Sequence, residues 1–114
     1  MTLRLYSALG REIRYFRPVT PGRASMYVCG VTPYDVTHLG HAFSYVQFDT
    51  LRRYLVYKGF NTRYVQNVTD IDDDMIMVSK RQGGRPIAEM RDAAAASLRR
   101  DLEAVNVLRP TAYT

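Results

Sequence analysis

The hydrophobic and polar positions of the chain alternate near its start and adopt longer spacings further on. Residues 3–6 alternate, residues 12–16 alternate again, and Gly10 lies between the two stretches. This pattern predicts a short β-hairpin. Two prolines and a glycine within residues 18–22 then indicate a turn. Residues 25–29 form a compact apolar run, which predicts a buried strand.

The spacing becomes helical from Leu39 onward. The apolar positions that fall largely on one helical face are Phe43, Val46, Leu51, Tyr54 and Leu55. Lys58 and Gly59 provide a basic residue and a glycine where we expect this helix to end. The segment before it, residues 32–35, is expected to be a loop because Pro33 interrupts strand pairing. A second strand is predicted over residues 63–68.

Two further helices are predicted in the second half of the chain. Thr69 is a suitable cap for the first, whose opening turn contains four aspartates between Asp70 and Asp74, and Gly83-Gly84 ends it. Pro86 opens the last helix, which has apolar residues at helical spacing up to Val105. The central strand–helix–strand is a βαβ unit, so we expect an α/β fold with a parallel sheet. Because two parallel strands do not form a stable sheet, we expect further strands beyond residue 114.

Composition and charge narrow the class of protein. Hydrophobic residues make up 46% and charged residues 24% of the 114 positions, which is typical of a globular domain. The net charge of +5 favours an acidic partner such as a nucleotide or a nucleic acid, although this signal is weak by itself. Cys29 is the only cysteine, so an internal disulfide is excluded. No apolar run is long enough for a membrane helix or a secretion signal, and we expect a cytoplasmic protein without membrane contact.

The segment from Cys29 to His41 lies where a strand is followed by a helix, the usual place of a ligand in α/β folds. His38 and His41 are three positions apart at the start of the helix, so their rings project from the same side. Gly40 between them lets a flat ligand approach the backbone. Two interpretations follow: the imidazoles stabilise charge on a phosphate under attack, or they cap and pack the helix. The spacing alone favours the second.

Two longer stretches carry a family resemblance. Residues 26–42, Met-Tyr-Val-Cys-Gly-Val-Thr-Pro-Tyr-Asp-Val-Thr-His-Leu-Gly-His-Ala, and residues 64–73, Tyr-Val-Gln-Asn-Val-Thr-Asp-Ile-Asp-Asp, resemble the signatures of cysteinyl-tRNA synthetases, which are class I enzymes. The resemblance implies the N-terminal half of a Rossmann-like nucleotide-binding catalytic domain. In that interpretation residues 1–24 form the hairpin and turn, and residues 25–114 form the βαβ core with its following helices.

The same resemblance implies an activity and a set of site residues. The activity would be cysteine–tRNA ligation, with L-cysteine, ATP accompanied by Mg²⁺, and tRNA(Cys) as partners. His38 and His41 would stabilise the transition state of cysteine activation, and Gly40 would seat the adenosine. Cys29 would be one ligand of a Zn²⁺ ion that selects the cysteine thiol. The residues implied to line the cysteine or adenylate pocket are Gly30, Thr32 and Thr69, with Ser44 as a weaker candidate.

Each of these residues can also have a purely structural role. A single cysteine is most often a small buried hydrophobic residue, and Thr32 and Thr69 are suited to satisfying loop and helix-end backbone. The aspartates of residues 70–74 are expected to complement a helix N-terminus and not to bind a divalent metal. The tyrosines at positions 45, 54 and 57 are expected in the core or at an interface.

Two residues bear on the acceptor of the activated cysteine. At Pro33 and Leu39 the sequence resembles that of a close relative of the synthetases, the ligase that joins cysteine to an amino-sugar inositol in mycothiol biosynthesis. Of the two activities, we rank the synthetase first. The other zinc ligands and the lysine-rich ATP loop of the family are not found, and residues 77–81 resemble that loop only superficially. We therefore expect an N-terminal fragment with little activity alone. The remaining hypotheses are a truncated nucleotide-binding paralog and a fragment that needs a complementing chain or a homo-oligomer.

Overall fold

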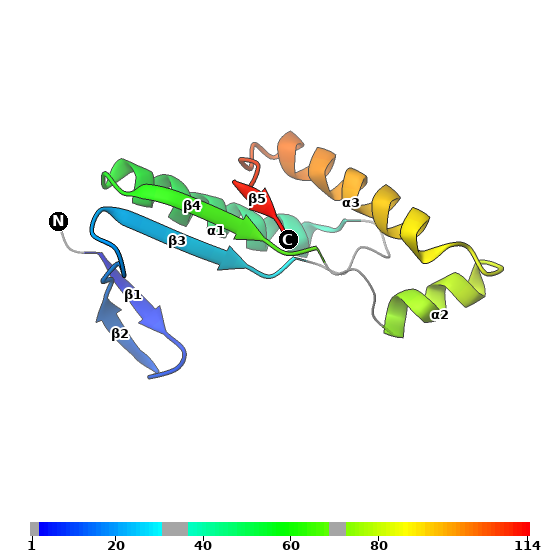
Figure 1. Ribbon diagram of the computed structural model, residues 1–114, viewed down its shortest axis with the longest axis horizontal. Coiled ribbons are helices and arrows are strands. Elements are labelled where there is room, and N and C mark those ends of the chain that lie inside the picture. Colours follow the sequence, from blue (N-terminus) through cyan, green and yellow to red (C-terminus); the bar gives the residue numbers. More distant parts are fainter. Residues whose placement is uncertain (1–2, 31–36, 69–72) are drawn as a thin grey trace.

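The computed structural model describes residues 3–30, 37–68 and 73–114, and arranges them as a hairpin followed by a helix-backed parallel sheet (Figure 1). The elements in chain order are β1 (Arg4–Ser7), β2 (Glu12–Tyr15), β3 (Arg23–Val28), α1 (Leu39–Tyr57), β4 (Asn61–Gln66), α2 (Asp73–Arg81), α3 (Ile87–Ala104) and β5 (Ala112–Tyr113). The predicted α/β fold and its βαβ unit, β3–α1–β4, are confirmed.

The hairpin of β1 and β2 is also confirmed. The strands pair antiparallel, with Arg4 opposite Tyr15 and Ser7 opposite Glu12. All residues of β2 are exposed, and the hairpin stands away from the sheet at the end where β3 begins (Figure 1). Phe16 follows β2 and makes an edge-to-face contact with Phe60, with ring centroids 5.5 Å apart. This aromatic contact ties the hairpin to the turn between α1 and β4.

The parallel sheet has the strand order β3-β4-β5. β3 and β4 pair over six residues each, and Val65 and Gln66 of β4 pair with the two residues of β5. β5 was not predicted from the sequence, because a strand of two residues is too short to show any periodic pattern. The third strand adds a second parallel crossover, from β4 through α2 and α3 to β5.

The core lies on one face of this sheet. It consists of Val28, Tyr45, Tyr64 and Leu102, with Met26, Leu98 and Val107 partly buried against it. α1 packs against β3, β4 and α3. The alternate residues of β3 are on the other face and exposed: Arg23, Ser25 and Tyr27. The prediction that residues 25–29 form a buried strand was therefore wrong at Ser25, Tyr27 and Cys29, because helices cover only one face in the described part of the chain.

α1 has the predicted extent but only part of the predicted face is buried, since Leu55 is buried and Leu51 is partly buried. Phe43, Val46 and Tyr54 are 66%, 41% and 39% exposed, whereas Tyr45, Asp49 and Leu55 are buried. Tyr45 therefore belongs to the core, one of the two places expected for it, while Tyr57 is 78% exposed. The buried face of α1 includes the carboxylate of Asp49, a polar group that a pattern of hydrophobic positions cannot predict.

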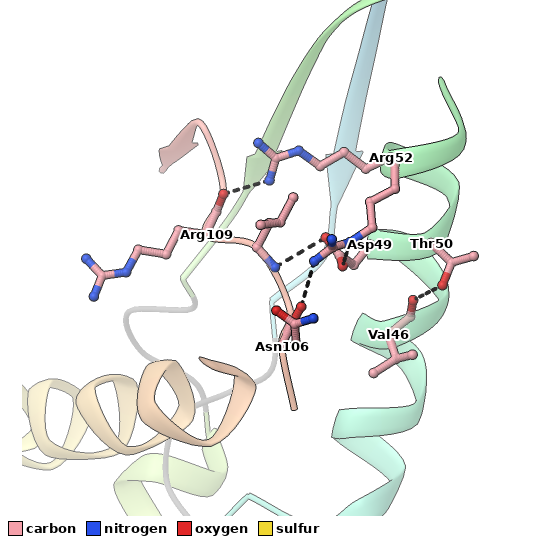
Figure 2. Close-up of polar contacts among 8 residues, drawn as sticks. Val46, Asp49, Thr50, Arg52, Asn106 and Arg109 are labelled. Atoms are coloured by element: carbon pink, nitrogen blue, oxygen red, sulfur yellow. Dashed lines mark hydrogen bonds and ion pairs between the residues drawn. The ribbon is translucent and has the colours of Figure 1, made fainter. Parts of the chain in front are cut away.

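The inward carboxylate of Asp49 connects α1 to the segment after α3 (Figure 2). Its Oδ2 atom accepts a hydrogen bond from Arg53 Nε at 2.6 Å, and its Oδ1 atom accepts one from the backbone N–H of Leu108 at 3.2 Å. Arg53 Nη2 donates to the carbonyl of Asn106 at 2.7 Å, and Arg52 Nη1 donates to that of Arg109 at 2.6 Å. These bonds hold the segment that leads into β5.

The described helices α1, α2 and α3 each end in a turn that pairs the last carbonyls with N–H groups beyond the helix, α2 with Gly83 at φ +76°. After α1, Gly59 adopts φ +87°, its N–H donates to Val56, and the N–H of Phe60 donates to Leu55. This is the Schellman arrangement, and the left-handed conformation explains the glycine. After α3, Asn106 takes the same position at φ 61°. The sequence predicted the endings of α1 and α2 from Gly59 and Gly83 but did not predict that of α3.

The expected start of the last helix is confirmed, since Pro86 is the N-cap of α3. Asp73 and Asp74 lie in the first turn of α2, where negative charge complements the helix dipole. The predicted cap Thr69 and the aspartates at positions 70 and 72 lie outside the described residues. Within the described ranges, no helix has the length and apolar character needed to cross a membrane.

Candidate functional site

The candidate site lies at the carboxyl ends of β3 and β4, where the N-terminus of α1 arrives. Gly30, just after β3, donates its backbone N–H to Oδ1 of Asn67, just after β4. A Cβ atom on Gly30 would lie 1.9 Å from the carbonyl oxygen of Asn67. Gly30 is therefore required by the close approach of two strand ends. Asn67 was not predicted as a site residue, although its position as a polar residue at a strand end was a visible signal in the sequence.

His38 and His41 form a reciprocal cap at the start of α1. The N-cap residue His38 accepts a hydrogen bond at Nδ1 from the backbone N–H of Gly40 at 3.1 Å. Nδ1 of His41 accepts a longer one, 3.4 Å, from the backbone N–H of His38. The rings stack with centroids 3.7 Å apart. The expectation that both rings project from one side is confirmed, and the pair does cap the helix.

This cap determines which ring nitrogen carries the proton. An Nδ1 atom that accepts a hydrogen bond carries no hydrogen, so each neutral ring has its proton on Nε2. Burial, and then the neighbouring His38, lower the pKa of His41 below its ordinary value of 6.5. This shift favours the neutral form of His41. Capping and anion binding are compatible functions, because the first uses Nδ1 and leaves the Nε2–H group of each ring as a donor.

Gly40 and Ser44 have defined local contacts. A Cβ atom on Gly40 would lie 3.0 Å from Cε1 and 3.1 Å from Nδ1 of His38, so the glycine makes room for the capping ring. The hydroxyl of Ser44 donates to the carbonyl of Gly40 at 3.2 Å within α1. Two other predicted pocket residues, Thr32 and Thr69, lie outside the described residues.

Cys29 directly follows β3, and its side chain is exposed. Its carbonyl accepts a hydrogen bond from the hydroxyl of Tyr45 at 3.3 Å, which fixes the strand end to α1. The interpretation of Cys29 as a buried hydrophobic residue is therefore wrong. A structural zinc ion needs four ligands and a catalytic one about three from protein. The described residues contain no group of three or more histidine, cysteine or acidic side chains placed to hold a metal, so they do not form a zinc site by themselves.

Comparison with known proteins identifies the family. The model of the class I tRNA synthetase (C) catalytic domain matches residues 15–114. The chain belongs to this family. Cysteine–tRNA ligases of Thermosynechococcus vestitus and Synechococcus elongatus are 46% identical to it over 113 residues, and that of Actinobacillus pleuropneumoniae is 42% identical over 108. These alignments cover 99%, 99% and 95% of this chain but only 23% of each relative, so the chain spans under a quarter of their length.

A solved structure supports the synthetase fold. The LeuRS of Agrobacterium radiobacter K84 (agnB2), crystallised in a ternary complex with tRNA and LeuAMS, matches with a TM-score of 0.63. The match covers 80% of this chain and 12% of that one, at 22% identity. At this identity the likeness concerns the fold alone. It agrees with the prediction that the chain is the N-terminal, Rossmann-like half of a class I synthetase domain.

Proposed function

We propose that the chain is part of a cysteine–tRNA ligase, which activates L-cysteine with ATP to cysteinyl-adenylate and transfers the cysteine to tRNA(Cys). The observation that carries this proposal is the His38–His41 pair at the N-terminus of α1, beside the carboxyl ends of two parallel strands. It occurs in a chain that is 42–46% identical to cysteine–tRNA ligases over almost its whole length.

The chemical role of the pair follows from its hydrogen bonds. During activation a carboxylate oxygen of cysteine attacks the α-phosphorus of ATP, a P–O bond forms, and pyrophosphate leaves with the electrons of the bond that breaks. Negative charge grows on the α-phosphate oxygens. The Nε2–H groups of His38 and His41 donate to these oxygens, and the positive end of α1 adds to the effect. The capping bonds hold both rings in place before the substrate arrives.

The remaining pocket residues have supporting roles in this proposal. Gly40 has no side chain at the first turn of α1, which allows the adenosine to approach the backbone. Gly30 keeps the ends of β3 and β4 together beneath the ligand. Ser44 retains an acceptor oxygen because its proton is donated within the helix. Thr32 and Thr69 are assigned to the pocket by family resemblance alone.

The metal ions and the location in the cell rest on the family resemblance. Zn²⁺ would take the exposed thiol of Cys29 as one ligand, and the others would have to come from outside the described residues. Mg²⁺ would accompany ATP. A cytoplasmic location is proposed with the function. The similarity of this chain to cysteine–tRNA ligases supports tRNA, and not an amino-sugar inositol, as the acceptor of the activated cysteine.

ATP–pyrophosphate exchange by the full-length protein tests the proposal. We expect exchange with cysteine and far less with serine, followed by charging of tRNA(Cys). The variants His38→Asn and His41→Gln keep the cap, because asparagine is a good N-cap and glutamine completes a capping box. They lose the imidazole donors, so kcat should fall about 100-fold or more. Gln47→Ala, on the exposed part of α1, is the control. Absence of cysteine-dependent exchange, or exchange unchanged in both variants, would refute the proposal.

A further inference from the structure

A basic cleft lies on the open face of the sheet, at the end where β3 and β4 begin. Its volume is about 530 Å³. One wall is the segment from Phe16 to Thr20, which leads from the hairpin to β3. The floor consists of Arg23 and Ser25 of β3 and of Asn61 and Arg63 of β4. In Figure 1 this end of the sheet is the one beside the hairpin.

Three arginines dominate the chemistry of this cleft. Arg17 comes from the wall, Arg23 from β3 and Arg63 from β4, and all three are exposed. Among the described residues, no acidic side chain lines the cleft, and none of the ion pairs found in the same ranges involves these arginines. The other polar lining groups are hydroxyls and an amide. The cleft therefore presents hydrogen-bond donors with an unbalanced positive charge.

The strand register places these groups on one surface. Arg23 pairs with Asn61 and Ser25 pairs with Arg63, so the two arginines lie diagonally on neighbouring strands of the same face. A face of a parallel sheet that packs against helices is normally apolar along its length. The polar start of these strands is instead suited to a charged, hydrated partner.

We propose that this cleft binds the phosphate backbone of RNA, at a place separate from the His38–His41 site. The two places lie at opposite ends of β3, roughly 20 Å apart at about 3.3 Å per strand residue. This inference rests on the proposed function, in which the RNA is the tRNA that receives cysteine. Contacts between the arginines and the phosphates do not distinguish one base from another. They hold and orient the RNA through charge.

The exposure of the arginines favours a polymer over a free nucleotide. An exposed ion pair contributes at most about 1 kcal/mol, so three of them hold a small anion only weakly. A small-molecule site normally buries most of its ligand. An RNA strand that is also bound elsewhere on the protein gains from each additional phosphate contact, because condensed counterions are released. Arginines from three separate segments are suited to that kind of distributed contact.

The experiment measures binding of a fluorescein-labelled tRNA(Cys) transcript to the full-length protein by anisotropy, between about 50 and 200 mM salt. We expect Arg23→Gln/Arg63→Gln to weaken binding about tenfold or more at the low-salt end. The slope of the logarithm of the binding constant against the logarithm of the salt concentration should become shallower by about 0.7 to 0.9 for each lost phosphate contact. Cysteine-dependent ATP–pyrophosphate exchange, which needs no RNA, should keep its wild-type rate. Arg100→Gln on the exposed side of α3 is the matched control.

The outcomes separate this inference from the proposed function. If exchange is absent from the wild type, the proposed function fails, while the anisotropy result still decides whether the cleft binds RNA. Unchanged affinity and salt slope in the double variant would overturn the inference. Displacement of the transcript by ATP at equal phosphate concentration would show a free-nucleotide site and would also overturn it. If the double variant does not fold, Arg17→Gln in the wall segment provides the same test outside the sheet.

Discussion

Asp49 and Leu108 are 59 positions apart, and the buried carboxylate of the first accepts the backbone N–H of the second at 3.2 Å. The same carboxylate pairs with Arg53 one helical turn further along α1. The bond fixes the segment that follows α3, and the chain then enters β5 beside β4. One polar residue on α1 therefore positions the third strand of the sheet.

Replacing Asp49 tests this role. We expect Asp49→Ala to lower the free energy of unfolding by about 2 kcal/mol, because the backbone N–H of Leu108 loses its acceptor. Asp49→Asn keeps an acceptor oxygen and should cost about half as much. Urea unfolding measures both. Glu12→Ala in the exposed hairpin pair is the control, with an expected effect within about 0.5 kcal/mol. Equal losses for the alanine and asparagine variants would contradict the role of the Leu108 bond.

Gly30→Ala should disturb the strand ends. The added methyl group would meet the carbonyl oxygen of Asn67 at 1.9 Å, so β3 and β4 must separate where the candidate site is formed. We expect a loss of about 2–3 kcal/mol in thermal or urea unfolding. Gly10→Ala is the matched control, because its Cβ would meet only flexible side-chain atoms of Glu12 and Arg14. If the two variants were equally stable, the close approach at Gly30 would be unimportant.

The cap at α1 should make stability depend on pH. The pKa of His41 is lowered in the folded chain, so between that pKa and 6.5 the unfolded chain binds more protons. The free energy of unfolding should therefore fall as the pH falls through this window. His41→Gln keeps the capping acceptor and removes the titration, and its profile should be flatter between about pH 5 and 7. Identical slopes for the wild type, Gln47→Ala and His41→Gln, measured by urea unfolding, would exclude this effect.

Asn106 should tolerate glycine but not valine. Its backbone has φ 61° at the turn after α3, where a β-branched residue costs about 1–2 kcal/mol. Asn106→Gly should change the free energy of unfolding by less than about 0.5 kcal/mol, because glycine is suited to this position. Arg53 bonds the main-chain carbonyl of residue 106, so both variants keep that contact. A valine variant as stable as the glycine variant in urea unfolding would contradict the conformational explanation.

Local sequence signals predicted much of the fold because their physical causes are local. The end of α1 and the start of α3 follow from Gly59 and Pro86, whose backbone preferences act within a turn. Alternation at the chain start predicted the hairpin, and a helix between two apolar runs predicted β3–α1–β4. The three-residue spacing of His38 and His41 predicted that their rings share a side, since helical geometry alone decides this.

Tertiary structure decided the features whose partners lie far along the chain. Asp49 faces inward beside Leu108 and the turn at Asn106, so periodicity predicted Leu55 correctly but missed the polar part of the buried face of α1. β5 exists because β4 offers it a hydrogen-bonding edge, and its two residues carry no pattern of their own. The contact of Gly30 with Asn67 and the grouping of arginines from three segments likewise depend on strand pairing. The sequence determined which groups are present, and non-local packing determined which of them meet.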